Sequence, residues 1–274
     1  MNRRDFVSAS MAAGGAWLSA DAVLEAVHGS QAGRAPERAA EYYELRRYRL
    51  RRGPAQGVVD TYLKSAALPA WQRAGVSPVG VFSVMIGPDS PAFYVLLVHK
   101  SLDAFASLPD RLAADAEYEK AAAPYLTAEA TAPAFVRIDG SLMRPFDGMP
   151  KLELPFGGGD GARRSRIFEL RTYESHSEKA AKKKIEMFNR AEIAIFRRAG
   201  LTPVFFGETL IGGNMPNLTY MLVYEDMAAH DKQWSAFAGD LEWKKLSTTP
   251  GYTDAEIVSN ISNVYLRPAA YSQV

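Results

Sequence analysis

The sequence contains no cysteine, and this absence excludes several classes of protein. Without thiols the chain cannot form disulfides, use a thiolate nucleophile, or hold zinc or an iron–sulfur cluster through cysteine. Histidine is also scarce: there are 4 histidines in 274 residues, and no two have the spacing of a metal-binding helix face. We therefore predict no metal site.

The chain also lacks an excess of charge of either sign, and it lacks a long apolar run. The 32 basic residues nearly balance 31 acidic ones, giving a net charge of +1. This balance argues against a protein that binds nucleic acid through bulk charge. No stretch approaches the roughly 18 consecutive apolar residues of a transmembrane helix, so we expect no stable membrane anchor.

The first 22 residues resemble an export signal. Arg3-Arg4 is followed by an aromatic residue and then by a run of small and apolar residues from 8 to 18. Ala20-Asp21-Ala22 provides a small-x-small cleavage site. The paired arginines resemble those of a twin-arginine signal, so we expect a periplasmic or secreted protein. We expect residues 23–40 to follow as a flexible leader.

The clearest feature that the sequence does contain is an internal repeat at an offset of 125 residues. Glu44-Leu45-Arg46 recurs as Glu169-Leu170-Arg171, and 21 of the 80 positions from 44 to 123 are identical to their partners without a gap. Two domains follow, at 41–145 and 166–268, joined by a Gly- and Pro-rich linker at 146–165 and ending in a tail at 269–274.

Each copy predicts the order strand, helix, strand, strand, helix, strand. In the first copy we expect strands at 42–50, 79–86, 92–99 and 134–143, and helical regions at 56–74 and 101–123. This order is the βαββαβ ferredoxin-like fold, an α+β class with both helices on one face of the sheet. The bare faces of two such sheets should pack together as an α/β barrel with a central cavity, within one chain as a pseudo-dimer or across a homodimer.

Three motifs resemble the NIPSNAP family: the Glu-Leu-Arg-x-Tyr strand, the Arg-Ala-Gly-[Leu/Val]-[Ser/Thr]-Pro helix exit, and the Asp-x-Glu-Trp end of the second helix. The resemblance covers both copies. It implies a dimeric α/β-barrel fold related to cofactor-free monooxygenases and haem-handling proteins, and it implies no particular reaction. The copies differ at Tyr118 and at 106–110, where the second copy carries Asp231-Lys232-Gln233-Trp234, so equal function of the two halves does not follow.

The first strand of each copy carries the main candidate ligand-binding residues. The two-residue period of a strand places three polar side chains on one face and the apolar ones on the other. The polar residues are Glu44, Arg46 and Tyr48, repeated as Glu169, Arg171 and Tyr173. We predict that this face lines the barrel cavity, where arginine binds a carboxylate or phosphate and tyrosine donates a hydrogen bond. The alternative is an ion pair that links the two sheets.

Three further candidate residues are His99, Tyr224 and Glu192. His99 ends the third strand, with Tyr224 as its counterpart, and is either a strand-end histidine facing solvent or a base or iron ligand. Glu192 interrupts an apolar helix stripe where the first copy has Ala67. A carboxylate at that position is either paired with a basic side chain or raised in pKa by burial, as a general base would be.

These residues support three classes of function. The first is a protein that binds a small organic ligand in the barrel cavity without a cofactor. The second is a cofactor-free monooxygenase or a haem-linked oxidoreductase, and the third is a scaffold that assembles with partners. The haem alternative rests on Gly157-x-x-Asp160-Gly161, which matches a motif of dye-decolourising peroxidases, with His230 downstream as the axial ligand. His230, Trp234 and Phe237 otherwise form an apolar helix stripe.

Overall fold

The computed structural model describes residues 41–155 and 166–274, which belong to one compact unit. The predicted signal at 1–22, the leader at 23–40 and the Gly157–Gly161 motif lie outside these residues. Within the part of the chain that the structure describes, every helix is too short or too polar to cross a bilayer.

Both repeats have the predicted order of elements. The first contains β1 (Tyr42–Arg49), α2 (Ala55–Tyr62), η1 (Leu63–Ala67), α3 (Leu68–Arg73), β2 (Val79–Ile86), β3 (Ala92–His99), α4 (Leu102–Ala106), α5 (Leu108–Ala113), α6 (Ala116–Leu126) and β4 (Arg137–Pro145). The second contains β5 (Ile167–Glu174), α7 (Glu178–Met187), η4 (Phe188–Glu192), α8 (Ile193–Arg198), β6 (Thr202–Ile211), β7 (Asn217–Tyr224), α9 (Met227–Gly239), α10 (Leu241–Ser247), α11 (Asp254–Ile257) and β8 (Asn260–Pro268).

The repeats agree in their first helical region and differ in their second. The first region of each copy contains a π-helical segment, η1 or η4, at positions 125 residues apart. In the second region the second copy has the continuous helix α9, whereas the first copy is broken into α4 and α5. Pro109 lies in the first turn of α5. A proline is tolerated there because it has no N–H to donate, and inside a longer helix it would break the hydrogen-bond ladder.

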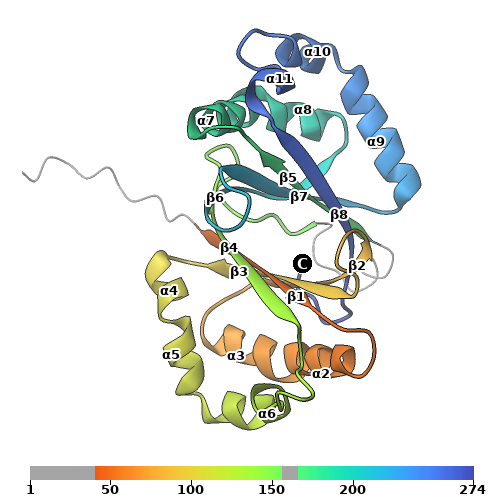
Figure 1. The fold of residues 1–274 in the computed structure, drawn as a ribbon. Coiled ribbons are helices and arrows are strands. Elements are labelled where there is room, and N and C mark those ends of the chain that lie inside the picture. The colour runs from red at the N-terminus through yellow and green to blue at the C-terminus, as the bar shows by residue number, and fades with distance from the viewer. Residues whose placement is uncertain (1–40, 156–165) are drawn as a thin grey trace, which may run out of the picture. The chain divides into compact units, whose positions relative to one another are not determined.

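The eight strands close into one barrel within the single chain, in the order β1-β3-β2-β8-β5-β7-β6-β4. Each repeat supplies four adjacent strands, and the seams are the antiparallel pairs β2–β8 and β4–β6. The helices of the two repeats cover opposite sides of the barrel (Figure 1). The chain is therefore an intrachain pseudo-dimer, and association of two whole chains stays a prediction.

The barrel interior is filled, so the predicted central cavity is wrong for most of its length. Its apolar side chains come from both repeats: Tyr43, Leu45, Phe82, Tyr94, Leu96, Val98, Met143, Phe168, Leu170, Val204, Phe205, Met221, Val223, Val264, Leu266 and Val274. A cavity of about 490 Å³ lies at the mouth where β1 and β5 end. The barrel fills because two sheets with apolar inner faces bury most surface when their side chains interdigitate.

The segments that follow the two repeats, 146–155 and 269–274, pack against the end of the barrel opposite the mouth. The Gln273 N–H donates to the carbonyl of Val79 at 2.9 Å, and the Glu153 N–H donates to that of Val204 at 3.0 Å. Val274 is buried in the interior, and Leu152 packs against the same cluster. The first ten residues of the predicted linker and the predicted tail are thus parts of the packed structure.

Candidate functional site

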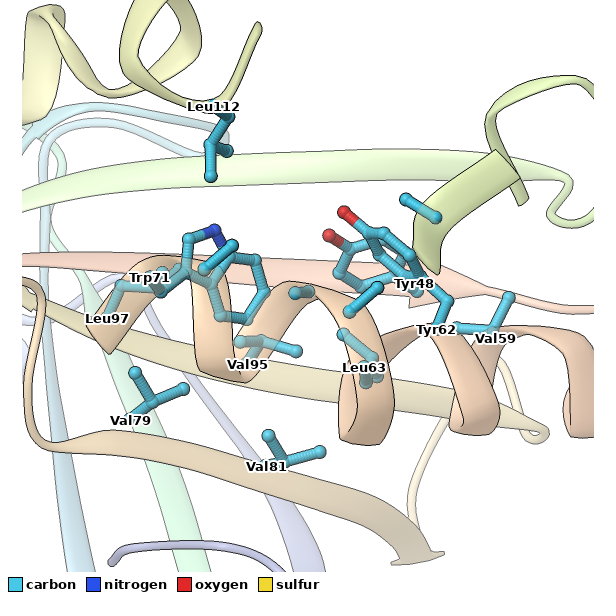
Figure 2. Close-up of a cluster of buried hydrophobic side chains, with 14 of the residues drawn as sticks. Tyr48, Val59, Tyr62, Leu63, Trp71, Val79, Val81, Val95, Leu97 and Leu112 are labelled. Carbon is cyan, nitrogen blue, oxygen red and sulfur yellow. The ribbon is translucent and has the colours of Figure 1, made fainter. Parts of the chain in front are cut away.

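The polar face of the first strand points toward the helices and not into the barrel. Tyr48 packs with Leu63 and Trp71 in the core of the first repeat (Figure 2), and Tyr173 packs with Phe188 in that of the second. The predicted alternation is correct, but the assignment of the two faces is wrong. The inner face is the more apolar one because it packs against another sheet, whereas the outer polar groups satisfy one another beneath the helices.

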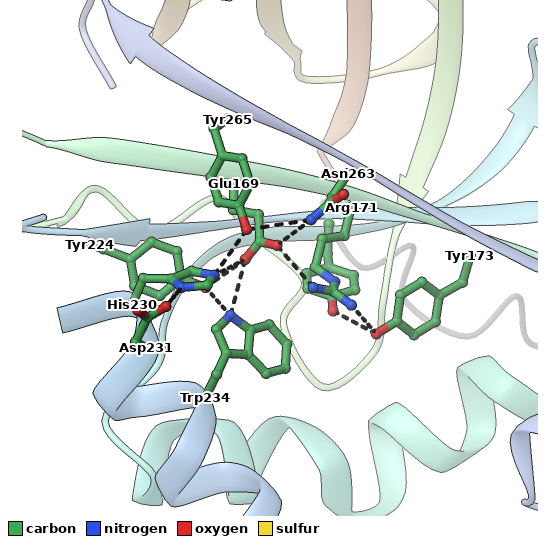
Figure 3. A network of polar contacts seen from close by, with 10 residues as sticks. Glu169, Arg171, Tyr173, Tyr224, His230, Asp231, Trp234, Asn263 and Tyr265 are labelled. Atoms are coloured by element: carbon green, nitrogen blue, oxygen red, sulfur yellow. Dashed lines mark hydrogen bonds and ion pairs between the residues drawn. The ribbon is translucent and has the colours of Figure 1, made fainter. Parts of the chain in front are cut away.

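In the second repeat these groups form a closed network around Glu169, whose side chain is fully buried (Figure 3). Its carboxylate accepts hydrogen bonds from Tyr224 at 2.8 Å, Arg171 at 2.9 Å, and the Trp234 indole and Asn263 amide, both at 3.1 Å. Burial alone would raise the pKa of Glu169, but the Arg171 charge and these donors outweigh it and lower the pKa. Glu169 is therefore ionised and fully satisfied.

Two aromatic rings lie close to the Arg171 guanidinium. The centroid of the Trp234 ring lies 4.6 Å from its Cζ, and the Tyr173 ring lies 5.6 Å away. A guanidinium stacked in this way is held by cation–π attraction. The predicted ion pair is present, but both of its members lie on β5, and it does not link the two sheets. The Trp234 indole connects the pair to helix α9.

His230 completes this network. Its Nδ1 lies 2.8 Å from Asp231 Oδ1, and its Nε2 lies 3.1 Å from the Tyr265 hydroxyl. Both ring nitrogens are thus engaged in hydrogen bonds. No cluster of metal-binding side chains occurs in residues 41–155 and 166–274.

In the first repeat His99 takes the place of Tyr224. Its Nε2 lies 2.9 Å from Glu44 Oε2, and Arg46 Nε donates to the other oxygen of the same carboxylate. Burial would raise the pKa of Glu44, but the His99 hydrogen bond and the Arg46 charge lower it overall. His99 is fully buried and does not face solvent. Its Nδ1 has no hydrogen-bond partner within the described residues.

A pocket of about 290 Å³ lies beside Arg46 in the first repeat, where the second repeat has the Trp234 indole over Arg171. The position equivalent to Trp234 is Pro109, whose small ring lines this pocket. The other lining residues come from α5 and α6: Leu108, Leu112, Ala113, Tyr118, Glu119 and Leu126. The two repeats thus hold the same Glu–Arg pair, one closed and one beside a pocket.

Tyr118 lines this pocket, and the centroid of the Trp71 ring lies 5.6 Å from Cζ of Arg46. Trp71 is fully buried, and its indole N–H has no acceptor within the described residues. The indole nitrogen points toward Leu112, a pocket residue (Figure 2). The Tyr118 hydroxyl lies 3.2 Å from that of Tyr62. A buried unpaired donor is costly in free energy, so Trp71 favours a ligand that brings an acceptor.

Glu192 lies far along the chain from this pocket, in the π-helical segment of the second repeat, and pairs with Lys184. Lys184 Nζ is 3.3 Å from Glu192 Oε2. It also lies 5.4 Å, 5.1 Å and 5.6 Å from the ring centroids of Tyr173, Phe188 and Trp243. Burial raises the pKa of Glu192 to about 7, although the Lys184 charge acts to lower it. Both side chains are almost completely buried, so we assign the pair to the helix–sheet core and not to a ligand site.

The family model for NIPSNAP matches residues 43–146 and 168–273, which together cover most of the chain. The chain belongs to the NIPSNAP family. A comparison with curated proteins found no match. Because both repeats match, the family assignment applies to each half of the barrel.

Solved structures share the fold of this NIPSNAP chain at low sequence identity. A protein of Fusobacterium nucleatum, provisionally named a monooxygenase, is 8% identical with a TM-score of 0.54 and covers 84% of this chain and 93% of its own. A second such protein, from Lactobacillus acidophilus, is 9% identical with a TM-score of 0.53, over 84% and 94%. An anthrone oxidase-like protein is 11% identical with a TM-score of 0.50, over 84% and 92%. These likenesses show the α/β-barrel fold alone.

Proposed function

We propose that this protein binds a small, mostly apolar molecule in the pocket beside Arg46, through an oxygen atom that accepts hydrogen bonds. The observation that carries the proposal is the difference between the repeats. Trp234 covers Arg171, whereas Pro109 leaves a pocket of about 290 Å³ beside Arg46. This volume is at the small end of the range of ligand pockets, and apolar lining with a few polar groups is their usual composition.

The polar groups of the pocket define the chemistry of its ligand. Glu44 engages Nε of Arg46, so the terminal nitrogens of the guanidinium are directed to other partners. Together with the Trp71 indole they offer N–H donors, while Tyr118 and Glu119 also line the pocket. A carboxylate or a ketone oxygen is the matching group, and the leucine side chains accommodate a hydrocarbon body. We assign no cofactor to this pocket.

A suitable probe is 1-naphthoate, which carries a carboxylate on an apolar ring system. Changing Arg46 to glutamine should weaken the binding of 1-naphthoate about 10- to 100-fold, because a charged hydrogen bond is lost. Isothermal titration calorimetry measures the affinity, and thermal unfolding of the same samples verifies that the variant is folded. Arg73→Gln is the control, since this arginine is partly exposed in the same repeat and pairs with Asp115. Equal affinity of the wild type and Arg46→Gln would contradict the proposal.

A second candidate function is oxidation of an anthrone-type substrate by dioxygen, and it is favoured by the Glu44–His99 pair. With Nε2 held by Glu44, the Nδ1 of His99 has no hydrogen-bond partner within the described residues, and it is the atom we propose as the general base. The substrate methylene would lose one proton to Nδ1, and dioxygen would oxidise the resulting anion to the quinone with release of water. An oxygen electrode with anthrone should record one dioxygen consumed per quinone.

The expected rate loss in His99→Gln is about 100-fold or more, the range for removal of a general base. Arg73→Gln again serves as the control that should keep the wild-type rate. If the wild type consumes no oxygen with anthrone, the catalytic candidate fails, while the binding proposal stands on the calorimetry.

We also propose that the chain is exported by the twin-arginine route. Residues 1–22 support this by their paired arginines and their cleavage site. Mass spectrometry of protein from the periplasm should find a chain that begins at Val23. The double variant Arg3→Lys/Arg4→Lys keeps the charge and should remain uncleaved in the cytoplasm. Equal export of the variant and the wild type would overturn the route.

A further inference from the structure

A cavity of about 490 Å³ lies at the barrel mouth and is separate from the pocket beside Arg46. Its floor is apolar and consists of Leu45, Leu170 and Val264, which belong to the filled interior of the barrel. Its walls come from both repeats, and they differ in chemistry. The volume is typical of a pocket for a small molecule.

The wall from the first repeat carries a quartet of two arginines and two aspartates, whose charges sum to zero. Asp139 lies 3.0 Å from Arg47 and 2.7 Å from Arg49. Asp89, from the β2–β3 hairpin, lies 3.1 Å from Arg47 and 3.6 Å from Arg49. Burial acts to raise the pKa of Asp139, but the two arginines outweigh it and lower the pKa, so this carboxylate is ionised.

The wall from the second repeat carries hydroxyls and amides and has no charged side chain among the residues that line the cavity. The position of Arg47 is taken by Thr172, whose hydroxyl lies 2.9 Å from that of Thr219. Ser262 and Asn217 line the same side. Each hydroxyl still has a lone pair or a proton to share, because a hydroxyl makes up to three hydrogen bonds.

We propose that this mouth binds an uncharged, polyhydroxylated molecule: a sugar of one or two rings. The two arginines are already neutralised by two aspartates, so a ligand acid would compete with carboxylates at hydrogen-bond distance. A sugar hydroxyl donates to Asp139 and accepts from Arg49 or a threonine, and therefore uses both walls. The C–H face of a sugar ring matches the apolar floor of Leu45, Leu170 and Val264.

The test is titration of the full chain with glucose, galactose, maltose and cellobiose, followed by calorimetry or by protein amide chemical shifts. At least one sugar should bind saturably, and the double variant Thr172→Val/Thr219→Val should weaken that binding at least about 10-fold. Removing both members of a hydrogen-bonded pair leaves no orphaned hydroxyl, so the fold should be preserved. Thr248→Val, an exposed threonine of the same repeat, is the control.

A second variant tests the neutrality of the quartet. Asp139→Asn leaves two arginines facing one aspartate, so sugar binding should weaken and sulfate or citrate should now bind at the mouth. Pro109→Trp fills the other pocket and should leave sugar binding unchanged, which keeps this proposal separate from the proposed function. The proposal is overturned if none of the four sugars binds saturably, or if Thr172→Val/Thr219→Val binds them as tightly as the wild type.

Discussion

Replacing Glu169 by leucine is expected to lower the free energy of unfolding by about 3–5 kcal/mol, because the change leaves Arg171 buried without its counter-charge. Glu169 is fully buried and accepts four hydrogen bonds from Arg171, Tyr224, Trp234 and Asn263. Its loss also removes the acceptor of the buried Tyr224 hydroxyl. Chemical denaturation followed by circular dichroism measures the effect.

The matched control removes both charges. In Glu169→Leu/Arg171→Met the buried pair is replaced by apolar side chains, and such replacements are often close to neutral in stability. The double variant should recover a large part of the loss. If it is no more stable than Glu169→Leu, the ion pair is not the source of the effect.

The same carboxylate should account for part of the acid sensitivity of the protein. The pKa of Glu169 is lowered from its ordinary value of 4.5, so its stabilising effect is complete above pH 4.5 and is lost as the pH falls through the lower, folded-state pKa. In Glu169→Gln the stability should be lower at neutral pH and should change less between pH 4.5 and pH 2 than in the wild type.

Changing Pro109 to tryptophan should abolish the binding of 1-naphthoate, with a loss of at least about 100-fold, because the indole fills the pocket beside Arg46. The second repeat shows that this fold accommodates a tryptophan at the position, since the Trp234 ring stacks on Arg171. The variant should therefore remain folded. Calorimetry gives the affinity, and unchanged affinity would contradict the location of the site.

The reverse change should open the second repeat. Trp234→Ala removes the ring that covers Arg171, at a cost of about 3 kcal/mol in stability. The stoichiometry of binding should rise from one ligand per chain toward two. A stoichiometry that stays at one would mean that features other than this tryptophan distinguish the repeats.

The sequence predicts the elements of the fold well because they depend on local patterns and on the repeat. The strands Val79–Ile86 and Ala92–His99 lie where alternation and the Gly-Pro-rich turn predict them. The broken second helix of the first repeat follows from Pro109. These features need only neighbouring residues, so periodicity and turn chemistry determine them.

Local patterns do not predict which face of each sheet packs against the other sheet and which face packs against the helices. On β1 both faces carry large side chains, Tyr43 on one and Tyr48 on the other, and both are buried. Polarity then suggests that Glu44 and Arg46 line a cavity. The actual arrangement depends on donors from distant segments, such as Asn263 and Trp234 for Glu169, which no local pattern reveals.

The candidate site was identified only in part for the same reason. Arg46 and its partner Glu44 are recognisable from the repeated motif, and the difference at 106–110 is visible by comparing the copies. The role of Trp71 cannot be predicted from the sequence, because its unpaired indole N–H is recognised only from the residues that surround it in the structure. The importance of Pro109 is likewise evident only in the structure, where the equivalent residue Trp234 lies over Arg171.

The most direct test of the account follows the indole N–H signals of the protein by nuclear magnetic resonance during titration with 1-naphthoate. The sequence has 4 tryptophans, so the spectrum is simple and Trp71→Phe assigns the decisive signal. We predict that the Trp71 signal shifts as its N–H gains an acceptor, while the signals of Trp234 and Trp243 stay in place. A saturating titration that leaves Trp71 unmoved, or that moves Trp234 in its place, would contradict a ligand site beside Arg46.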